Sequence, residues 1–176
     1  MILAIDPGPI ETGWALLHGI SYEPFDFGKD KNTDLFNELN SVPRKEWMAG
    51  HLTSVVIEKP VCQRYSGSSI SDTAVQAGIF AGLYRPLTRV YLITRSKVRG
   101  HFCGNKGNDS TIIKALVHRF APDTPNLGKG HAKTPGYFYG FKADIWQAYA
   151  LGVCFIDLRD SEKSKDIEYL LEGRIE

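Results

Sequence analysis

The sequence has few cysteines and no long apolar run, and both absences narrow the class of protein. Its 176 residues include three cysteines, Cys62, Cys103 and Cys154, which lie far apart and form no CxxC pair. Neither a disulfide framework nor a zinc knuckle is therefore indicated. No stretch approaches the roughly 20 consecutive apolar residues that would span a bilayer, and the N-terminus lacks the pattern of a secretion signal. We therefore expect a soluble protein of the cytoplasm.

Three common catalytic motifs are absent as well. The five histidines never fall at HxxxH or HxH spacing, which argues against a transition-metal site. The chain has no GxSxG elbow, so a serine hydrolase of that type is not indicated. It also has no GxxxxGK[ST] segment, which argues against a P-loop nucleotide site.

The charge of the chain is distributed unevenly. The formal net charge is only +1, but residues 85–142 carry 11 Lys or Arg against 2 Asp or Glu, a net charge of +9. The flanking segments, 1–84 and 143–176, each carry a net charge of −4. A basic segment in an otherwise acidic molecule is typical of a surface that binds phosphates. A membrane surface, an acidic protein and a solvated face without a partner are the alternatives.

Apolar periodicity predicts one α/β domain. Strands are expected at residues 1–6, 12–18, 22–27, 52–57 and 89–94, and helices at 32–40, 71–83, 109–120 and 143–156. Asp109 or Ser110 is expected to cap the third helix. Residues 96–108 and 122–140 contain Gly, Lys and Pro and are expected to form loops, and the charged segment 157–176 an exposed helix.

The helix expected at 71–83 carries small residues at every fourth position. These are Ala74, Gly78 and Gly82. Residues at this spacing lie on one face, so another backbone can approach that face closely. The neighbouring backbone belongs either to the sheet of the same domain or to a second copy of the chain.

Three acids occupy the ends of apolar segments. Asp6 ends the first strand, Glu58 follows the most apolar strand, and Asp144 begins the most apolar helix. Carboxylates that cluster beside apolar segments repel one another unless a cation compensates their charge. Oxygen-only ligands favour Mg²⁺, with Mn²⁺ able to substitute. Two such ions about 4 Å apart could activate water for phosphodiester hydrolysis.

The order of elements and three motifs resemble a known family. IDPGPIETGWAL at 5–16, VVIEKP at 55–60 and KADIWQAYALGV at 142–153 are similar to the three motifs of RuvC-type Holliday-junction resolvases, within the ribonuclease H-like superfamily. The segment RVYLITRSKVRGHFCGNKG at 89–107 is similar to the strand and basic loop before the junction-binding helix of that family. The resemblance implies a ribonuclease H-like α/β fold over residues 1–160, with a mixed five-stranded sheet flanked by helices, and a charged tail at 161–176.

The resemblance assigns roles to the acids and also reveals a departure. It implies that Asp6, Glu58 and Asp144 bind the metal. The family commonly has a further acid three residues beyond the first acid of the final helix, and Gln147 stands there. A helix places residues 144 and 147 on one face, so Gln147 can reach the site through a neutral amide oxygen. In an alternative register Asp144 matches the later acid, and Phe141 takes the earlier position.

Basic and aromatic residues complete the expected site. Arg99 stands where the family has a catalytic lysine, and its guanidinium would stabilise transition-state charge rather than donate a proton. We expect Lys97, Lys106 and Lys114 near the scissile phosphates, although surface lysines also serve solubility. Arg64 and Tyr65 follow Glu58 in a loop, where Tyr65 could stack on an unpaired base or be an ordinary surface tyrosine. The nucleic-acid-binding residues expected are Arg64, Tyr65, Lys97, Lys106 and Lys114.

These features predict a structure-selective DNA endonuclease that acts on four-way junctions as a homodimer. Two strands of like polarity must be cut, and two sites related by a dyad can cut them symmetrically. The resemblance implies products with 5'-phosphate and 3'-hydroxyl ends, and the short chain is compatible with a phage-encoded resolvase. A non-catalytic junction-binding protein and a ribonuclease H acting on RNA–DNA hybrids are the alternatives. An actin-like ATPase would need a second large lobe, for which 176 residues leave no room.

Overall fold

The computed structural model describes residues 1–40, 50–61, 68–104, 107–161 and 168–169. Its main sheet has the strand order β3-β2-β1-β4-β5-β8. The strands are β1 (Ile2–Asp6), β2 (Glu11–Leu17), β3 (Pro24–Lys31), β4 (Ser54–Lys59), β5 (Arg89–Thr94) and the two-residue β8 (Glu168–Tyr169). A separate hairpin pairs β6 (Gly130–His131) with β7 (Thr134–Pro135). The helices are α1 (Asn32–Asn40), α3 (Ser68–Tyr84), α4 (Arg95–Cys103), α5 (Asp109–Phe120) and α6 (Ala143–Arg159).

The sheet is mixed, as the sequence predicts. Strands β1, β2 and β3 form an antiparallel meander, whereas β4 and β5 run parallel to β1. The predicted five-stranded α/β sheet is therefore confirmed, and β8 adds a short antiparallel pairing along β5. Within the described residues, no helix is both long enough and apolar enough to cross a membrane.

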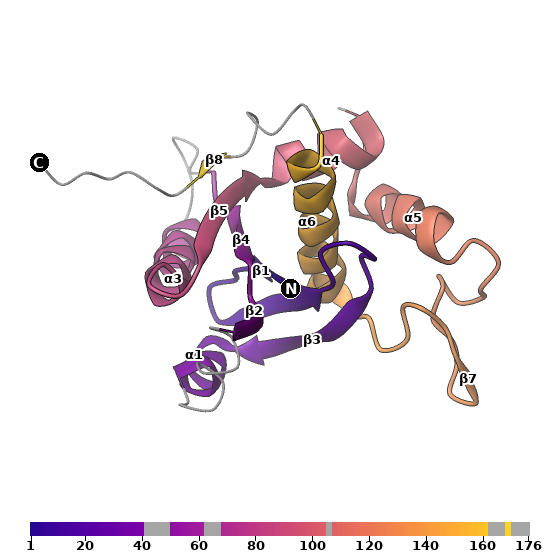
Figure 1. Ribbon diagram of the computed structural model, residues 1–176, viewed down its shortest axis with the longest axis horizontal. Helices are drawn as coiled ribbons and strands as arrows, with labels where there is room; N and C mark the ends of the chain where they lie inside the picture. The colour runs from indigo at the N-terminus through magenta and orange to yellow at the C-terminus, as the bar shows by residue number, and fades with distance from the viewer. Residues whose placement is uncertain (41–49, 62–67, 105–106, 162–167, 170–176) are drawn as a thin grey trace, which may run out of the picture.

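Alternating strand residues build a separate core on each face of the sheet. Ile2, Ala4 and Val56 face α6 and the buried sides of α4 and α5. Leu3, Ile5 and Val55 point the other way, toward α1 and α3. This is the period-two pattern of strands buried on both faces. Figure 1 shows the resulting three layers, with α4, α5 and α6 on one face of the sheet and α1 and α3 on the other.

The sequence prediction of a loop over residues 96–108 is wrong. Residues Arg95–Cys103 form α4, directly after β5. Thr94 caps this helix, because its Oγ1 accepts a hydrogen bond from the backbone N–H of Lys97 at 3.3 Å, and Val98 anchors it in the core. A short helix with a single buried residue has too little apolar periodicity to be found from its sequence.

Other element boundaries also differ from the prediction. Asn108 caps α5 in place of Asp109 or Ser110, with Thr111 completing a capping box. This cap leaves the carboxylate of Asp109 available for another contact. Helix α6 extends to Arg159 and so includes the start of the segment predicted as an exposed helix, 157–176, whereas residues 168–169 of that segment form a strand.

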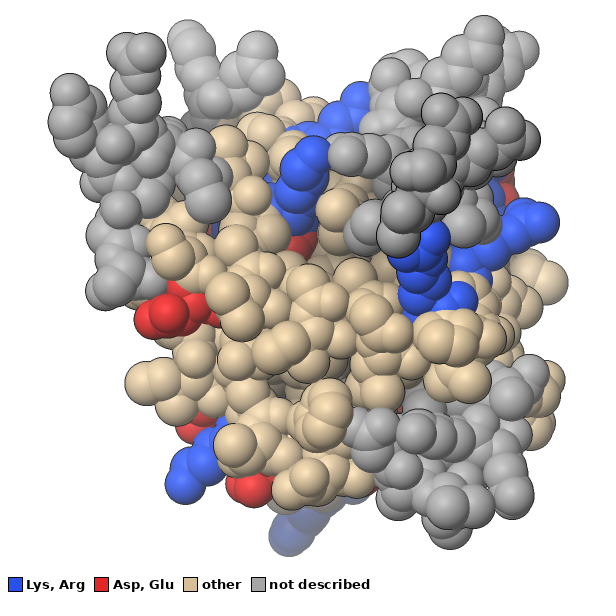
Figure 2. All heavy atoms as spheres, turned by 90° about the vertical axis from the view of Figure 1, so that its left-hand side faces the viewer, with Lys and Arg blue, Asp and Glu red and all other residues tan. Residues whose placement is uncertain are grey.

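The small residues of α3 border an open groove. Ala77 packs into the core, but a Cβ added at Gly78 or Gly82 would meet no atom within 4 Å. The groove has a volume of about 410 Å³ and is lined mainly by Ala, Gly and branched apolar residues of α3 and β5. Figure 2 shows this side of the molecule, where uncharged side chains cover the middle of the face. Packing within the domain therefore covers only part of the small-residue face of α3.

Candidate functional site

Two of the predicted acids meet at one edge of the sheet. Asp6 is the last residue of β1 and Glu58 the last but one of β4. These strands are parallel neighbours, with Ile5 paired to Ile57, so their carboxyl ends lie side by side. Only 14% of the Asp6 side chain and 17% of the Glu58 side chain are exposed.

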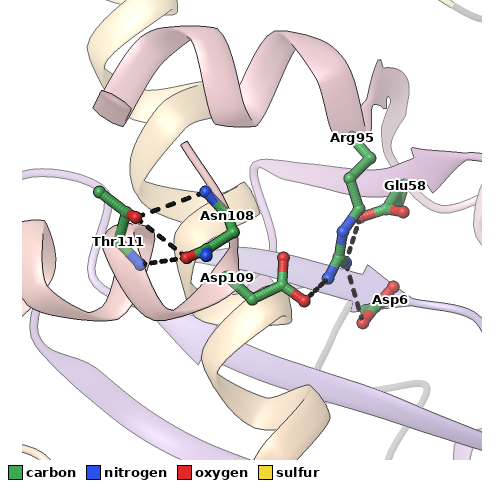
Figure 3. Close-up of polar contacts among 6 residues, drawn as sticks. All are labelled: Asp6, Glu58, Arg95, Asn108, Asp109 and Thr111. Atoms are coloured by element: carbon green, nitrogen blue, oxygen red, sulfur yellow. Dashed lines mark hydrogen bonds and ion pairs between the residues drawn. The ribbon is translucent and has the colours of Figure 1, made fainter. Parts of the chain in front are cut away.

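The guanidinium group of Arg95 lies between these acids. Its Nη1 is 3.1 Å from Oε2 of Glu58 and 3.8 Å from Oδ2 of Asp6. Its Nη2 is 2.8 Å from Oδ2 of Asp109, the first residue of α5. One cation from the start of α4 thus contacts carboxylates from three different elements, as Figure 3 shows.

The third predicted acid lies across a cleft from the first. Asp144, in the first turn of α6, pairs with Lys29 of β3 at 2.9 Å, and the same Lys29 Nζ is 2.9 Å from Glu11. The cleft has a volume of about 580 Å³. It is lined by Asp6, Pro7, Gly8, Pro9, Ile10, Glu11, Lys29, Arg95 and Asp144. Its size is within the range of small-molecule and substrate sites.

Burial and mutual repulsion shift the acids toward their neutral forms. Burial raises the pKa of Asp6 to about 8, the charges of Glu58 and Asp144 add to the increase, and Arg95 opposes it. Burial also raises the pKa of Glu58, against the attraction of Arg95. In both carboxyl groups, the effect of burial on the pKa thus outweighs the attraction of Arg95.

The donor set fits a hard divalent cation. Asp6 and Glu58 offer only oxygen ligands, and burial raises the pKa values of both carboxyl groups. Mg²⁺ is usually held by one or two carboxylates together with waters and substrate phosphates. In the described part of the chain, no three His, Cys, Asp or Glu side chains lie close enough to share one ion. The fit thus rests on the pair formed by Asp6 and Glu58, with Asp144 on the opposite wall.

The structure gives Gln147 and Arg99 different environments. Gln147 is buried in α6, with 8% of its surface exposed. It is not one of the described residues that line the cleft. Arg99 lies one helical turn after Arg95, and its positive charge lowers the pKa of Glu58. Arg99 is thus near the acid edge, whereas Gln147 belongs to the core.

The predicted nucleic-acid-binding residues are described only in part. Lys97 lies half-buried on α4, and Lys114 is exposed on α5. Arg64, Tyr65 and Lys106 lie outside the described residues.

The sequence analysis did not identify Arg95, Asp109 or Lys29 as site residues. Arg95 follows the end of β5, next to β4, where Glu58 pairs in register with Ile93. Like the two acids, this arginine stands at the carboxyl end of a parallel strand, so the same reasoning could have identified it as a site residue. Asp109 was interpreted as a helix cap, and nothing in the sequence of β3 pointed to Lys29.

Comparison with known proteins supports the fold. No family model matches the sequence, and no curated protein matches it. Among solved structures, a T. thermophilus RuvC in complex with Holliday junction substrate has a TM-score of 0.60 and 12% identity, covering 96% of this chain and 98% of that one. A Thermus thermophilus RuvC structure has a TM-score of 0.59 and 12% identity, covering 96% and 99%. The protein therefore has the RuvC-like variant of the ribonuclease H-like α/β fold.

Proposed function

We propose that this protein is a structure-selective DNA endonuclease that resolves four-way junctions by metal-dependent hydrolysis of phosphodiesters. The observation that supports it is the pair of half-buried acids, Asp6 and Glu58, at the carboxyl edge of the parallel strands, beside a cleft that also contains Asp144. The fold that carries them is similar over nearly its whole length to a RuvC solved with Holliday junction substrate. Fold alone does not define activity, so the proposal depends on the acids.

Asp6 and Glu58 would hold Mg²⁺, or Mn²⁺ in its place, with Asp144 facing them across the cleft. When bound by these residues, Mg²⁺ would activate a water and would stabilise the charge of the leaving oxygen. Arg95 and Arg99 bring guanidinium groups to the same edge, and guanidinium binds phosphate oxygens in a bidentate manner. Lys29 adds a cation on the opposite wall. These groups would orient the phosphate of a DNA strand in the cleft.

The basic segment 85–142 would bind the arms of the junction. It includes α4, α5 and the β6–β7 hairpin, which form one side of the molecule in Figure 1. Lysine and arginine neutralise backbone phosphates without reading the base sequence. This agrees with an enzyme that selects DNA by its branched shape.

The groove beside α3 would hold a second copy of the chain. It is apolar and open, and Gly78 and Gly82 place no side chain in it. An isologous contact along this helix would relate two clefts by a dyad, as symmetric cutting of two strands requires. The partner we propose is therefore another copy of this protein, forming a homodimer.

Cleavage of a synthetic four-way DNA junction tests the proposal. We expect nicks that need Mg²⁺ or Mn²⁺, and little cleavage of a linear duplex or an RNA–DNA hybrid. Asp6→Asn should lower the rate about a thousandfold or more, because it removes a charged ligand from the buried pair. The matched control is Asp34→Asn, the same change at an exposed position of α1, outside both the cleft lining and the basic segment, and it should leave the rate unchanged. Preferential cleavage of the hybrid would instead indicate a ribonuclease H.

A non-catalytic junction-binding protein is the second candidate function. Two observations favour it: Arg95 already contacts both acids, and the buried position 147 carries a neutral amide. Junction binding by the wild-type protein without any nicking in Mg²⁺ or Mn²⁺ would select this candidate over the endonuclease.

A further inference from the structure

The position of Arg95 is unusual for a site that offers its oxygens to a metal. A single nitrogen, Nη1, contacts both Glu58 and Asp6, the two acids best placed to share an ion. The guanidinium is thus located where the charge of a divalent cation would be needed. Figure 3 shows it pointing into the space between the two carboxylates.

The second nitrogen of the same group has a separate partner. Nη2 is 2.8 Å from Asp109, whose side chain is 51% exposed and lies at the start of α5. Arg95 can therefore leave the acid pair and still keep a charged hydrogen bond. The arginine side chain is itself 30% exposed and is not one of the buried residues of the core.

The charges at this edge explain why Arg95 is held there. Two half-buried carboxylates without a counter-ion would repel each other strongly, because the surrounding protein screens charge less than water does. Arg95 supplies one positive charge, whereas the ionised forms of Asp6, Glu58 and Asp109 together carry three negative charges. A divalent ion would compensate the pair better than one guanidinium.

We infer that Arg95 is the built-in counter-ion of the acid pair and that a divalent cation displaces it, so that metal binding is an exchange of cations. This inference rests on the proposed function only in taking Asp6 and Glu58 as the ligands of the ion. Before the exchange, Arg95 bridges Glu58, Asp6 and Asp109. After it, the guanidinium remains on Asp109, beside the cleft, where it can meet a phosphate.

Two measurable quantities should change in opposite directions when Arg95 is removed. The metal-free protein should lose thermal stability, because the carboxylates lose their counter-ion. The affinity for a divalent ion should increase, because no resident cation has to be displaced. A purely structural salt bridge would give the first effect without the second.

The experiment is a calorimetric titration of the DNA-free protein with Mn²⁺, together with thermal unfolding in the presence of a chelator. We expect Arg95→Gln to bind Mn²⁺ about tenfold more tightly than the wild type, since it removes a unit charge next to the site. Its unfolding temperature without metal should be lower. Arg119→Gln is the matched control, because Arg119, in the last turn of α5, also pairs with a carboxylate, that of Asp157 in α6. It should lower the unfolding temperature and leave the Mn²⁺ affinity unchanged.

A second variant keeps the inference testable if Arg95→Gln does not fold. Arg95→Lys retains the charge but replaces the planar fork by one ammonium group, which cannot bridge the carboxylates in the same way. Its Mn²⁺ affinity should lie between those of the wild type and the glutamine variant. Equal or weaker Mn²⁺ binding in both variants, or no binding by any of the proteins, would overturn the exchange. The Mn²⁺ titration contains no DNA, so it tests the exchange of cations independently of cleavage. If the protein bound Mn²⁺ as expected but did not cleave junctions, only the proposed function would be contradicted.

Discussion

At the scale of single residues, Asp157 of α6 connects α5 with α4, the helix that carries Arg95 of the cleft. Its carboxylate accepts hydrogen bonds from the Tyr22 hydroxyl at 2.8 Å and from both Arg119 Nη atoms at 2.6 and 2.9 Å, and it lies 2.7 Å from His101 Nε2. His101 belongs to α4, Arg119 to α5 and Asp157 to α6. This one carboxylate therefore holds α4 and α5 against the core, and with them Arg95.

The same contacts set the charge state of Asp157. Burial alone would raise its pKa, but the hydrogen bonds from His101, Arg119 and Tyr22 hold the pKa well below its usual range. A carboxylate whose pKa is lower in the folded than in the unfolded state stabilises the fold above the unfolded pKa, near 3.9. This contribution is lost as the pH falls below that value.

Asp157→Asn should consequently destabilise the protein at neutral pH and less so in acid. We expect a loss of about 2 kcal/mol in the free energy of unfolding at pH 7, the magnitude of hydrogen bonds to a charged group. The difference from the wild type should shrink as the pH falls from about 4 toward 2. Urea unfolding across this pH range measures both effects. Asp160→Asn, an exposed change three residues along, is the control, and an equal loss there would refute the role of the network.

At the scale of elements, the first turn of α6 lies unusually close to the sheet. Gly13 of β2 pairs with Asp6 of β1, and a Cβ added at Gly13 would lie 2.7 Å from both the Cβ and the carbonyl oxygen of Asp144. Only glycine fits between the strand and the helix at this point. The missing side chain therefore allows Asp144 to face Asp6 across the cleft.

Gly13→Ala should disturb stability and cleavage together. The added methyl group must push α6 away from β2, and such overpacking typically costs 1 to 3 kcal/mol. Because the shift moves Asp144, we expect junction cleavage to fall about tenfold or more, the scale of effect that small misplacements of a reacting group produce. Urea unfolding and a cleavage assay give the two values.

Gly100→Ala provides the comparison for this change. Gly100 lies within α4, and an added Cβ there meets no atom within 4 Å. Alanine is favoured over glycine inside a helix, so this variant should gain about 0.5 to 1 kcal/mol. A Gly13→Ala protein as stable and active as wild type would show that α6 can shift without consequence.

The elements also show which parts of the site could be predicted from the sequence. Runs of β-branched residues identified β4 and β5. Asp6 and Glu58 stand at the ends of their strands, and parallel neighbouring strands end at the same edge of the sheet, so the two acids could be expected there. The contacts of Arg95 could not be predicted in this way. They depend on α4, whose only buried side chain is Val98, and on the Asn108 cap that leaves Asp109 available. Pairing across elements is a property of packing rather than of local pattern.

At the scale of the whole molecule, the α3 groove and the acid cleft are separate surfaces. The groove is formed mainly by α3 and β5, whereas the cleft is formed by the β1–β2 loop, Lys29 of β3 and the starts of α4 and α6. A second copy bound in the groove would therefore leave the cleft open to DNA. This separation allows dimerisation and cleavage to be tested independently.

Gly78→Glu should convert the proposed dimer into a folded monomer. The position is exposed and has room for a side chain, so the fold should tolerate the change. Burying a carboxylate in an apolar contact between two chains is strongly unfavourable, so the dimer should dissociate. The mass in solution should then fall from that of two chains to that of one. Light scattering with size-exclusion chromatography gives the mass. Gly100→Glu, equally open but on α4, should remain dimeric; a monomeric wild type would exclude the dimer.

The distribution of charge over the molecule predicts how junction binding depends on salt. In Figure 1 the β6–β7 hairpin projects from the body of the protein, and it carries the exposed Lys133 at its turn. The hairpin is held in place, because Gly136 N–H donates to Lys129 at 2.8 Å and Phe138 is fully buried. A cation on a fixed projection within the basic segment is well placed to contact a junction arm.

Lys133→Gln should therefore weaken junction binding and also reduce its salt dependence. Each phosphate contact adds about 0.9 to the slope of log affinity against log salt concentration, so the slope should decrease by about 1. Fluorescence anisotropy of a labelled junction, measured in a chelator over a series of KCl concentrations, gives both values. Lys31→Gln changes an equally exposed lysine on β3, in the acidic part of the chain, and should leave the slope unchanged. Both variants remove one exposed positive charge, so only a local contact with a junction arm can make their slopes differ. If the two variants reduced the slope equally, binding would depend on the net charge of the protein and not on the basic surface.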